Sequence, residues 1–119
     1  MKKTLVLGAS PSPSRISYTA VRLLRDKGHE VIPLGIRNGN IDGLAIQHGL
    51  PLLKDVDTVT MYLNPDNQQE YYDYLIGLKP KRIIFNPGSE NPELIRLARD
   101  HGIEVDLACT LVLLSVGSY

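Results

Sequence analysis

Short apolar runs of strand length alternate along this chain with segments that have helical spacing. The runs are bounded by turn residues and most contain Val or Ile, which is typical of strands buried on both faces of a sheet. This alternation predicts right-handed crossovers and a three-layer, doubly wound α/β fold with a mainly parallel, Rossmann-like five-stranded sheet. The expected strands are Thr4–Leu7, Glu30–Leu34, Thr58–Leu63, Arg82–Phe85 and Ile103–Leu107. The expected helices contain Ile16–Leu24, Tyr71–Leu78 and Leu94–Ala98.

Length and composition favour one soluble domain over residues 1–119. The 13 basic residues balance 13 acidic residues, which argues against a nucleic-acid partner held by long-range attraction. The apolar stretch Leu5–Ala9 is too short for a secretory signal, and no window approaches the roughly 18 apolar residues of a membrane span. A lone cysteine, Cys109, fits a reducing compartment. We therefore expect a cytoplasmic protein without a nucleic-acid or membrane partner.

The segment between Gly35 and Asp57 has the weakest pattern, because glycine and asparagine break it into short pieces. We expect a short edge strand there, near Leu44–Ile46 or near Leu50–Leu52. A single helical turn is expected to follow around Lys54.

Three expected helices are preceded by a capping residue and a proline, a combination that suits a helix start. The pairs are Ser12-Pro13, Asn64-Pro65 and Asn91-Pro92. Each pair follows a strand, and the carboxyl ends of parallel strands share one edge of a sheet. Any single pair is explained by ordinary helix capping. All three together, with extra glycine at Gly8 and Gly88, favour an anionic ligand at that edge.

The turn after the first strand, which begins at Gly8, lacks both common nucleotide fingerprints. It has neither the second and third glycines of G-x-G-x-x-G nor the Gly-Lys-Ser/Thr of a P-loop. The second strand is followed by Ile36-Arg37, where a NAD-binding domain has an acidic residue. An arginine there favours a phosphorylated ribose, present in both NADP and coenzyme A, unless Arg37 is simply a solvated loop charge.

Side chains suited to catalysis are sparse. No two histidines have the spacing of metal ligands, and Cys109 has no obvious neighbouring base, so we interpret it as a buried structural cysteine. The tyrosines at positions 71, 72 and 74 form a helix face that suits packing or a dimer contact. The apolar tail Leu111–Val116 fits either a homodimer contact or a buried terminal helix.

A succession of short motifs resembles the small stand-alone CoA-binding domain family. Members of that family are similar to the amino-terminal CoA-binding domain of the succinyl-CoA synthetase α subunit. The resemblance covers nearly the whole chain, and its specificity lies in the order of the motifs. These are Gly8-Ala-Ser-x-x-Pro-Ser-Arg15, Gly28-His-Glu-Val-Ile-Pro33, Ile41-Asp-Gly43, Asn86-Pro-Gly-Ser-Glu-Asn91 and Gly102-Ile-Glu-Val with Cys109.

The resemblance implies a CoA site at the carboxyl edge of the sheet. Phosphates would lie at the first turn, with backbone N–H groups at Ser10 and Ser12 as donors. Ile36 and Arg37 would flank the adenosine end, and Asn64-Pro65 would border the opposite side. The implied ligand-contacting residues are Gly8, Ala9, Ser10, Ser12, Ser14, Arg15, Ile36, Arg37, Asn64, Pro65, Asn86, Pro87, Gly88, Asn91 and Cys109.

The chain departs from the family pattern at three places. It has Gly35-Ile36 where the family commonly has Asn-Pro, and Leu63-Asn64 where the family has an arginine before proline. Asn86 replaces a glutamine. The first two changes imply a weaker adenine cradle and one fewer phosphate contact, which lower the expected affinity for CoA.

The leading hypothesis is therefore non-enzymatic binding of CoA or a short acyl-CoA, because it needs no catalytic constellation. Two alternatives stay open. One is an NADP-dependent oxidoreductase or NADP sensor, which Arg37 permits and the missing glycines disfavour. The other is an accessory subunit of an acyl-CoA ligase.

Overall fold

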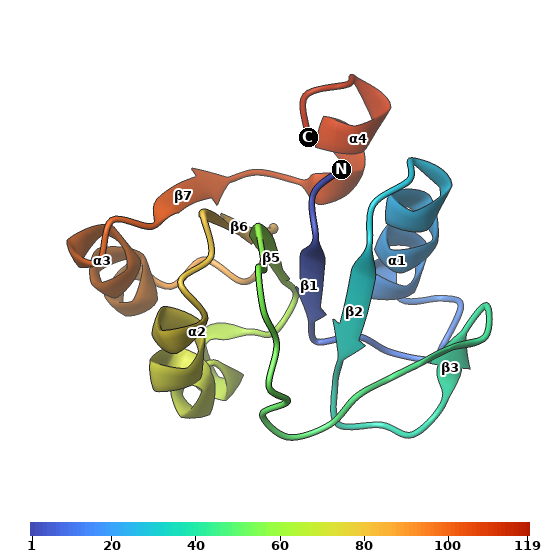
Figure 1. The fold of residues 1–119 in the computed structure, drawn as a ribbon, viewed down its shortest axis with the longest axis horizontal. Helices are drawn as coiled ribbons and strands as arrows, with labels where there is room; N and C mark the ends of the chain where they lie inside the picture. Colours follow the sequence, from blue (N-terminus) through green and yellow to red (C-terminus); the bar gives the residue numbers. More distant parts are fainter.

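A computed structural model describes all residues, 1–119, and contains a five-stranded parallel sheet flanked by helices (Figure 1). The predicted three-layer α/β class is confirmed. The strands, in spatial order, are β2 (Val31–Leu34), β1 (Thr4–Leu7), β5 (Thr58–Met61), β6 (Arg82–Phe85) and β7 (Glu104–Leu107). The helices are α1 (Ile16–Asp26), α2 (Tyr72–Leu78), α3 (Pro92–Asp100) and α4 (Thr110–Ser115).

The strand order reverses at β1, which pairs with β2 on one side and β5 on the other. The chain after β1 therefore leaves the sheet in one direction, and the chain after β5 leaves it in the other. Open α/β sheets bind ligands at such a switch point, beyond the carboxyl ends of the strands.

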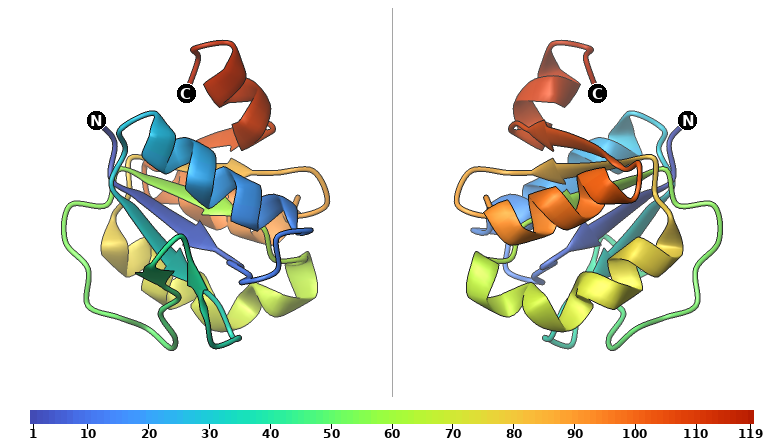
Figure 2. Two further views of the ribbon diagram at one scale, coloured as in Figure 1. Left: turned by 90° about the vertical axis from the view of Figure 1, so that its right-hand side faces the viewer. Right: turned by 90° about the vertical axis from the view of Figure 1, so that its left-hand side faces the viewer.

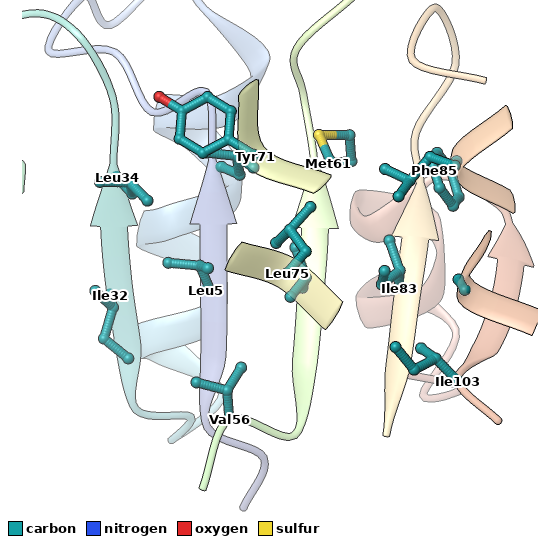
Figure 3. Close-up of a cluster of buried hydrophobic side chains, with 14 residues drawn as sticks. Leu5, Ile32, Leu34, Val56, Met61, Tyr71, Leu75, Ile83, Phe85 and Ile103 are labelled. Atoms are coloured by element: carbon teal, nitrogen blue, oxygen red, sulfur yellow. The ribbon is translucent and has the colours of Figure 1, made fainter. Parts of the chain in front are cut away.

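The core has two halves, one on each face of the sheet. Alternate strand residues point to opposite faces, so Leu5 and Leu7 pack toward α2 and α3 while Val6 packs toward α1 and α4. Figure 2 shows α1 and α3 on opposite sides of the sheet. Figure 3 shows the larger cluster, to which Leu75 of α2 also contributes. Strands β1, β2, β5 and β6 are buried along their whole length, which keeps the sheet rigid beneath the loops at its carboxyl edge.

The segment after β2 differs from its prediction. Strands β3 (Asn40–Ile41) and β4 (Leu44–Ala45) form a separate antiparallel hairpin rather than an edge strand of the main sheet. No strand forms at Leu50–Leu52, and the predicted helical turn at Lys54 is wrong. The segment has no regular secondary structure, and Asp55 has a φ of +58°, which is incompatible with a right-handed helical turn. The Lys3 ammonium donates to the Lys54 carbonyl at 2.6 Å.

The three predicted helix starts have different outcomes. Asn91 caps α3, its Oδ1 accepting from two backbone N–H groups, as predicted. Asn64 caps η1 (Pro65–Asn67), a 3₁₀ turn that leads through η2 (Gln69–Tyr71) into α2. Ser12 caps nothing: its carbonyl accepts from the Arg15 N–H in a tight turn, so α1 begins only at Ile16. The prediction that Ser12-Pro13 starts the first helix is therefore wrong.

Two further expectations concern the apolar surface. Most of the apolar tail Leu111–Val116 belongs to α4. Leu114 of this helix is buried, whereas Val112 and the C-cap residue Val116 are exposed. The three tyrosines expected to share a helix face lie at the end of η2 and the start of α2 and do not form an exposed stripe. Tyr71 is buried, and Tyr72 and Tyr74 are partly buried against the larger core cluster. No helix is both long and apolar enough to cross a membrane.

Candidate functional site

A crevice with a volume of about 480 Å³ lies beyond the carboxyl ends of β2, β1, β5 and β6. It spans the β1/β5 switch point, as predicted for this topology. Its walls are drawn from four loops and the first turn of α1. The residues that line it are Leu7, Gly8, Ala9, Ser10, Arg15, Ile16, Ser17, Gly35, Ile36, Arg37, Tyr62, Leu63, Asn64, Asn67, Tyr71, Pro87 and Gly88.

Two glycines allow the loops beneath the crevice to approach each other. A Cβ on Gly35 would lie 2.2 Å from the carbonyl oxygen of Ala9, so the end of β2 touches the turn after β1 backbone to backbone. Gly8 has φ +100°, and a Cβ there would lie 3.1 Å from the backbone nitrogen of Leu63. Side chains at either position would push these loops apart and change the floor of the crevice.

The amino terminus of α1 opens into the crevice. Its first two residues, Ile16 and Ser17, line the cavity, and their backbone N–H groups have no hydrogen-bond partner in the chain. The N-cap residue, Arg15, makes no side-chain cap bond. Free N–H groups and the positive end of the helix dipole make this wall suited to an anion such as a phosphate.

The charged side chains on the crevice have one sign. Arg15 and Arg37 line it, neither forms an ion pair, and no Asp or Glu is among the lining residues. Arg37 follows β2, whereas Pro87 and Gly88 follow β6. Because β1 and β5 lie between these two strands, Arg37 is at the opposite end of the crevice from Pro87 and Gly88. An elongated anion lying across the strand ends would therefore meet positive charge in two places, at Arg15 beside the start of α1 and at Arg37 beyond β2.

Nine of the predicted ligand-contacting residues line this crevice. They come from all four loops, as the shared edge of a parallel sheet requires. They are Gly8, Ala9, Ser10, Arg15, Ile36, Arg37, Asn64, Pro87 and Gly88.

Asn86 is one of six predicted residues that do not line it, and its side chain belongs to the framework. Its Nδ2 donates to Thr60 Oγ1 at 2.7 Å and to the Met61 carbonyl at 2.9 Å. Its Oδ1 accepts from the Thr110 N–H at 2.8 Å. Asn86 is 3% exposed. These three bonds join the carboxyl ends of β5 and β6 to the start of α4.

Asn91 is likewise occupied by the framework. In addition to capping α3, its Nδ2 donates to Gln68 Oε1 at 3.0 Å and to the Tyr72 hydroxyl at 2.8 Å. Gln68 is completely buried and donates to the carbonyls of Leu63 and Ser89. This pair fixes the start of α3 to the loop that follows β5.

The other predicted residues outside the lining are Ser12, Ser14, Pro65 and Cys109. The Ser12 N–H donates to Ser10 Oγ at 3.1 Å, so it is not the free phosphate donor expected from the sequence. The Ser14 hydroxyl bonds to that of Ser12 at 3.0 Å. Cys109 is half-buried at the N-cap position of α4.

Sequence reasoning missed two tyrosines on the crevice walls. Tyr62 directly follows β5, and burial is the main cause that raises its pKa to about 12. Tyr71 lies before α2, and burial, with the charge of Glu70, raises its pKa above the usual value of 10. Their aromatic side chains gave only a packing signal in the sequence. The place of Tyr62 just beyond a buried strand was the one available indication of its site.

Comparisons with known proteins found one family model and several solved structures that are similar to this chain. A family model for the CoA binding domain matches residues 2–115. The crystal structure of an uncharacterized protein is 50% identical, with a TM-score of 0.98, over 100% of this chain and 98% of that chain. A conserved hypothetical protein from Pyrococcus furiosus is 27% identical, with a TM-score of 0.82, over 94% and 98% of the two chains.

A larger protein contains a similar unit. Acetyl-coenzyme A synthetase 1 from Ca. Korarchaeum cryptofilum, solved with phosphate and ADP, matches 91% of this chain with 26% of its own length. The TM-score is 0.71 and the sequence identity 22%, so this likeness shows the shared fold.

Proposed function

Because the chain belongs to the family of CoA binding domains, we propose that its crevice binds coenzyme A or a short acyl-CoA and leaves it chemically unchanged. The observation that carries this proposal is the combination of free N–H groups at the start of α1 with two unpaired arginines, in a crevice without carboxylates. The volume of about 480 Å³ lies in the usual range of roughly 300–1,000 Å³ for small-molecule sites.

The pyrophosphate belongs at the first turn. There Ile16 and Ser17 offer backbone donors, and the Arg15 side chain lies on the same wall. Gly8 lets the backbone reach the ligand closely because it has no side chain in the way. These groups recognise phosphate oxygens by hydrogen bonds and dipole, which suits a nucleotide of either CoA or NADP type.

Arg37 distinguishes the end of the ligand that lies beyond β2. Its guanidinium is exposed at the crevice without an acidic partner, so it is available to a phosphate on a ribose. The neighbouring Ile36 is 84% exposed, an unusual state for isoleucine that offers an apolar surface to a base. The adenosine 3′-phosphate of CoA therefore belongs at this end, and the pantetheine arm toward Asn64, Pro87 and Gly88.

Binding without chemistry is supported by the ionisable groups on the walls. These are two arginines and two tyrosines, Tyr62 and Tyr71, whose pKa values are raised. Groups that keep their protons near neutral pH bind anions well and are poor general bases.

The homodimer expected from the sequence stays a prediction, which a sedimentation measurement of the free chain would test.

Calorimetric titration of the purified chain with CoA, acetyl-CoA, dephospho-CoA, NADP and NAD tests the proposal. We expect CoA and acetyl-CoA to bind more tightly than dephospho-CoA, because only the first two present the 3′-phosphate to Arg37. Arg37→Ala should weaken CoA about tenfold, the usual scale for losing a charge-assisted hydrogen bond, and leave dephospho-CoA nearly unchanged.

Arg99→Ala is the matched control, because it removes the same charge from an exposed position in the last turn of α3, away from the crevice. It should leave all affinities within twofold. Tight binding of NADP without binding of CoA would contradict the proposal. Equal weakening of CoA and dephospho-CoA by Arg37→Ala would contradict the assignment of the 3′-phosphate.

A further inference from the structure

Tyr71 carries a hydroxyl group that the protein itself does not use. Only 7% of this residue is exposed, and its ring is part of the larger core cluster, together with Leu34 and Leu75. The hydroxyl makes no hydrogen bond within the chain, yet the residue lines the crevice. Figure 3 shows the ring at the carboxyl ends of the strands, with the oxygen directed toward the β2 side above Leu34.

The neighbouring tyrosines show that this arrangement is unusual for the region. The Tyr74 hydroxyl donates to the Pro51 carbonyl at 2.5 Å, and the Tyr72 hydroxyl accepts from Asn91. Tyr62 also has an unpartnered hydroxyl, but that oxygen is enclosed by protein. The Tyr71 oxygen is not enclosed in this way, so it is the unpartnered phenol that a molecule in the crevice reaches.

Packing alone does not account for a tyrosine here. A phenylalanine ring would fill the same space in the core, whereas the tyrosine adds a polar atom that is not enclosed by protein and lies at the crevice. Burial raises the pKa of the Tyr71 hydroxyl, so it keeps its proton at neutral pH and is a donor. An acceptor on a bound ligand would complete its hydrogen bonding.

We propose that the Tyr71 hydroxyl donates a hydrogen bond to the nucleoside part of the bound nucleotide and so selects ligands that carry an adenosine. This inference rests on the proposed CoA site. It assigns Tyr71 as a residue that determines specificity, in addition to the phosphate groups already described.

The direction of the Tyr71 side chain determines which part of the ligand its hydroxyl contacts. The phosphates lie at the turn after β1, and the strand order places β2 on one side of that turn and β5 with β6 on the other. The Tyr71 oxygen is directed toward the β2 side, where Ile36 and Arg37 receive the nucleoside and its phosphate. The pantetheine arm extends in the opposite direction, out of its reach.

The test compares wild type, Tyr71→Phe and Tyr74→Phe by calorimetric titration with CoA, adenosine 3′,5′-bisphosphate and 4′-phosphopantetheine. We expect Tyr71→Phe to weaken CoA and the bisphosphate roughly 3- to 10-fold, the usual range for one neutral hydrogen bond. Its affinity for 4′-phosphopantetheine should stay within twofold of wild type. Tyr74→Phe is the matched control, one tyrosine hydroxyl removed from the adjoining helix α2, and should change none of the three.

Thermal melting of the free variants separates recognition from folding. Tyr71→Phe should melt close to the wild-type temperature, because the hydroxyl that it removes bonds to no protein atom and is not enclosed by protein. Unchanged CoA affinity in Tyr71→Phe, or equal weakening of all three ligands, would overturn the inference while the CoA site stands. Failure of the wild-type chain to bind CoA at all would overturn the proposed function, and the inference with it.

Discussion

Replacing Asn86 by alanine separates a framework role from a ligand role at the end of β6. The sequence places this asparagine at the ligand, whereas its side chain makes three hydrogen bonds to protein atoms. Asn86→Ala removes all three. The most costly loss is the acceptor for the buried Thr110 N–H, the first residue of α4, because that donor has no alternative partner in the structure.

The expected loss of folding free energy follows from the bonds that break. An orphaned buried N–H costs about 1–3 kcal/mol, and a typical neutral hydrogen bond contributes about 1 kcal/mol. Thr60 keeps its bond to Thr110 at 2.7 Å, so its hydroxyl is not orphaned. We therefore expect Asn86→Ala to lower the free energy of unfolding by about 3 kcal/mol, a large part of the roughly 5–15 kcal/mol of a typical domain.

Urea denaturation of wild type and variant, analysed with a common m value, measures this difference. The matched control is Asn38→Ala, at an exposed loop position whose side chain makes no hydrogen bond, and we expect its effect to stay within about 0.5 kcal/mol. CoA affinity of folded Asn86→Ala should remain within about threefold of wild type. Wild-type stability combined with a tenfold or greater loss of CoA affinity would refute the framework role and restore Asn86 as a ligand group.

Two other predictions concern the support of the crevice and the response to pH. Gly35→Ala should destabilise the chain by about 2 kcal/mol, because its Cβ would lie 2.2 Å from the Ala9 carbonyl oxygen. Gly77→Ala, which meets no atom within 4 Å in α2, should stabilise it by about 0.5 kcal/mol; equal melting shifts of the same sign would contradict this steric argument. Burial, followed by nearby positive charges, lowers the pKa of His29 below 6.5, so its neutral form, which accepts from the Lys2 N–H, is favoured in the folded state. Stability should therefore be full above pH about 6.5 and decline below it, and the melting temperature of His29→Asn should fall less than that of wild type between pH about 7.5 and 5.

The fold was predictable because its signals are local. Buried strands such as Thr4–Leu7 are recognised from their apolar, β-branched composition. Helix starts such as Asn91-Pro92 are recognised from their capping residue and proline. The segment from Gly35 to Asp57 was less predictable, because its conformation is set by partners distant in sequence. The Lys3 side chain bonds to the Lys54 carbonyl, and no pattern around Lys54 signals that donor.

The position of the crevice was predictable from the sequence, but the side chains that line it were predictable only in part. The three Asn-Pro steps show why. Asn64, Asn86 and Asn91 each follow a strand and precede a proline, so the sequence gives them equal standing as ligand contacts. In the structure Asn64 is exposed on the crevice, whereas the other two are 3% and 5% exposed. Asn86 is held by the Thr110 N–H and Asn91 by the Gln68 side chain. These partners lie 24 and 23 residues away in the sequence, and they make the difference. A neutral amide serves a buried framework and a ligand equally well, so only the residues that surround it in the folded chain decide which role it takes.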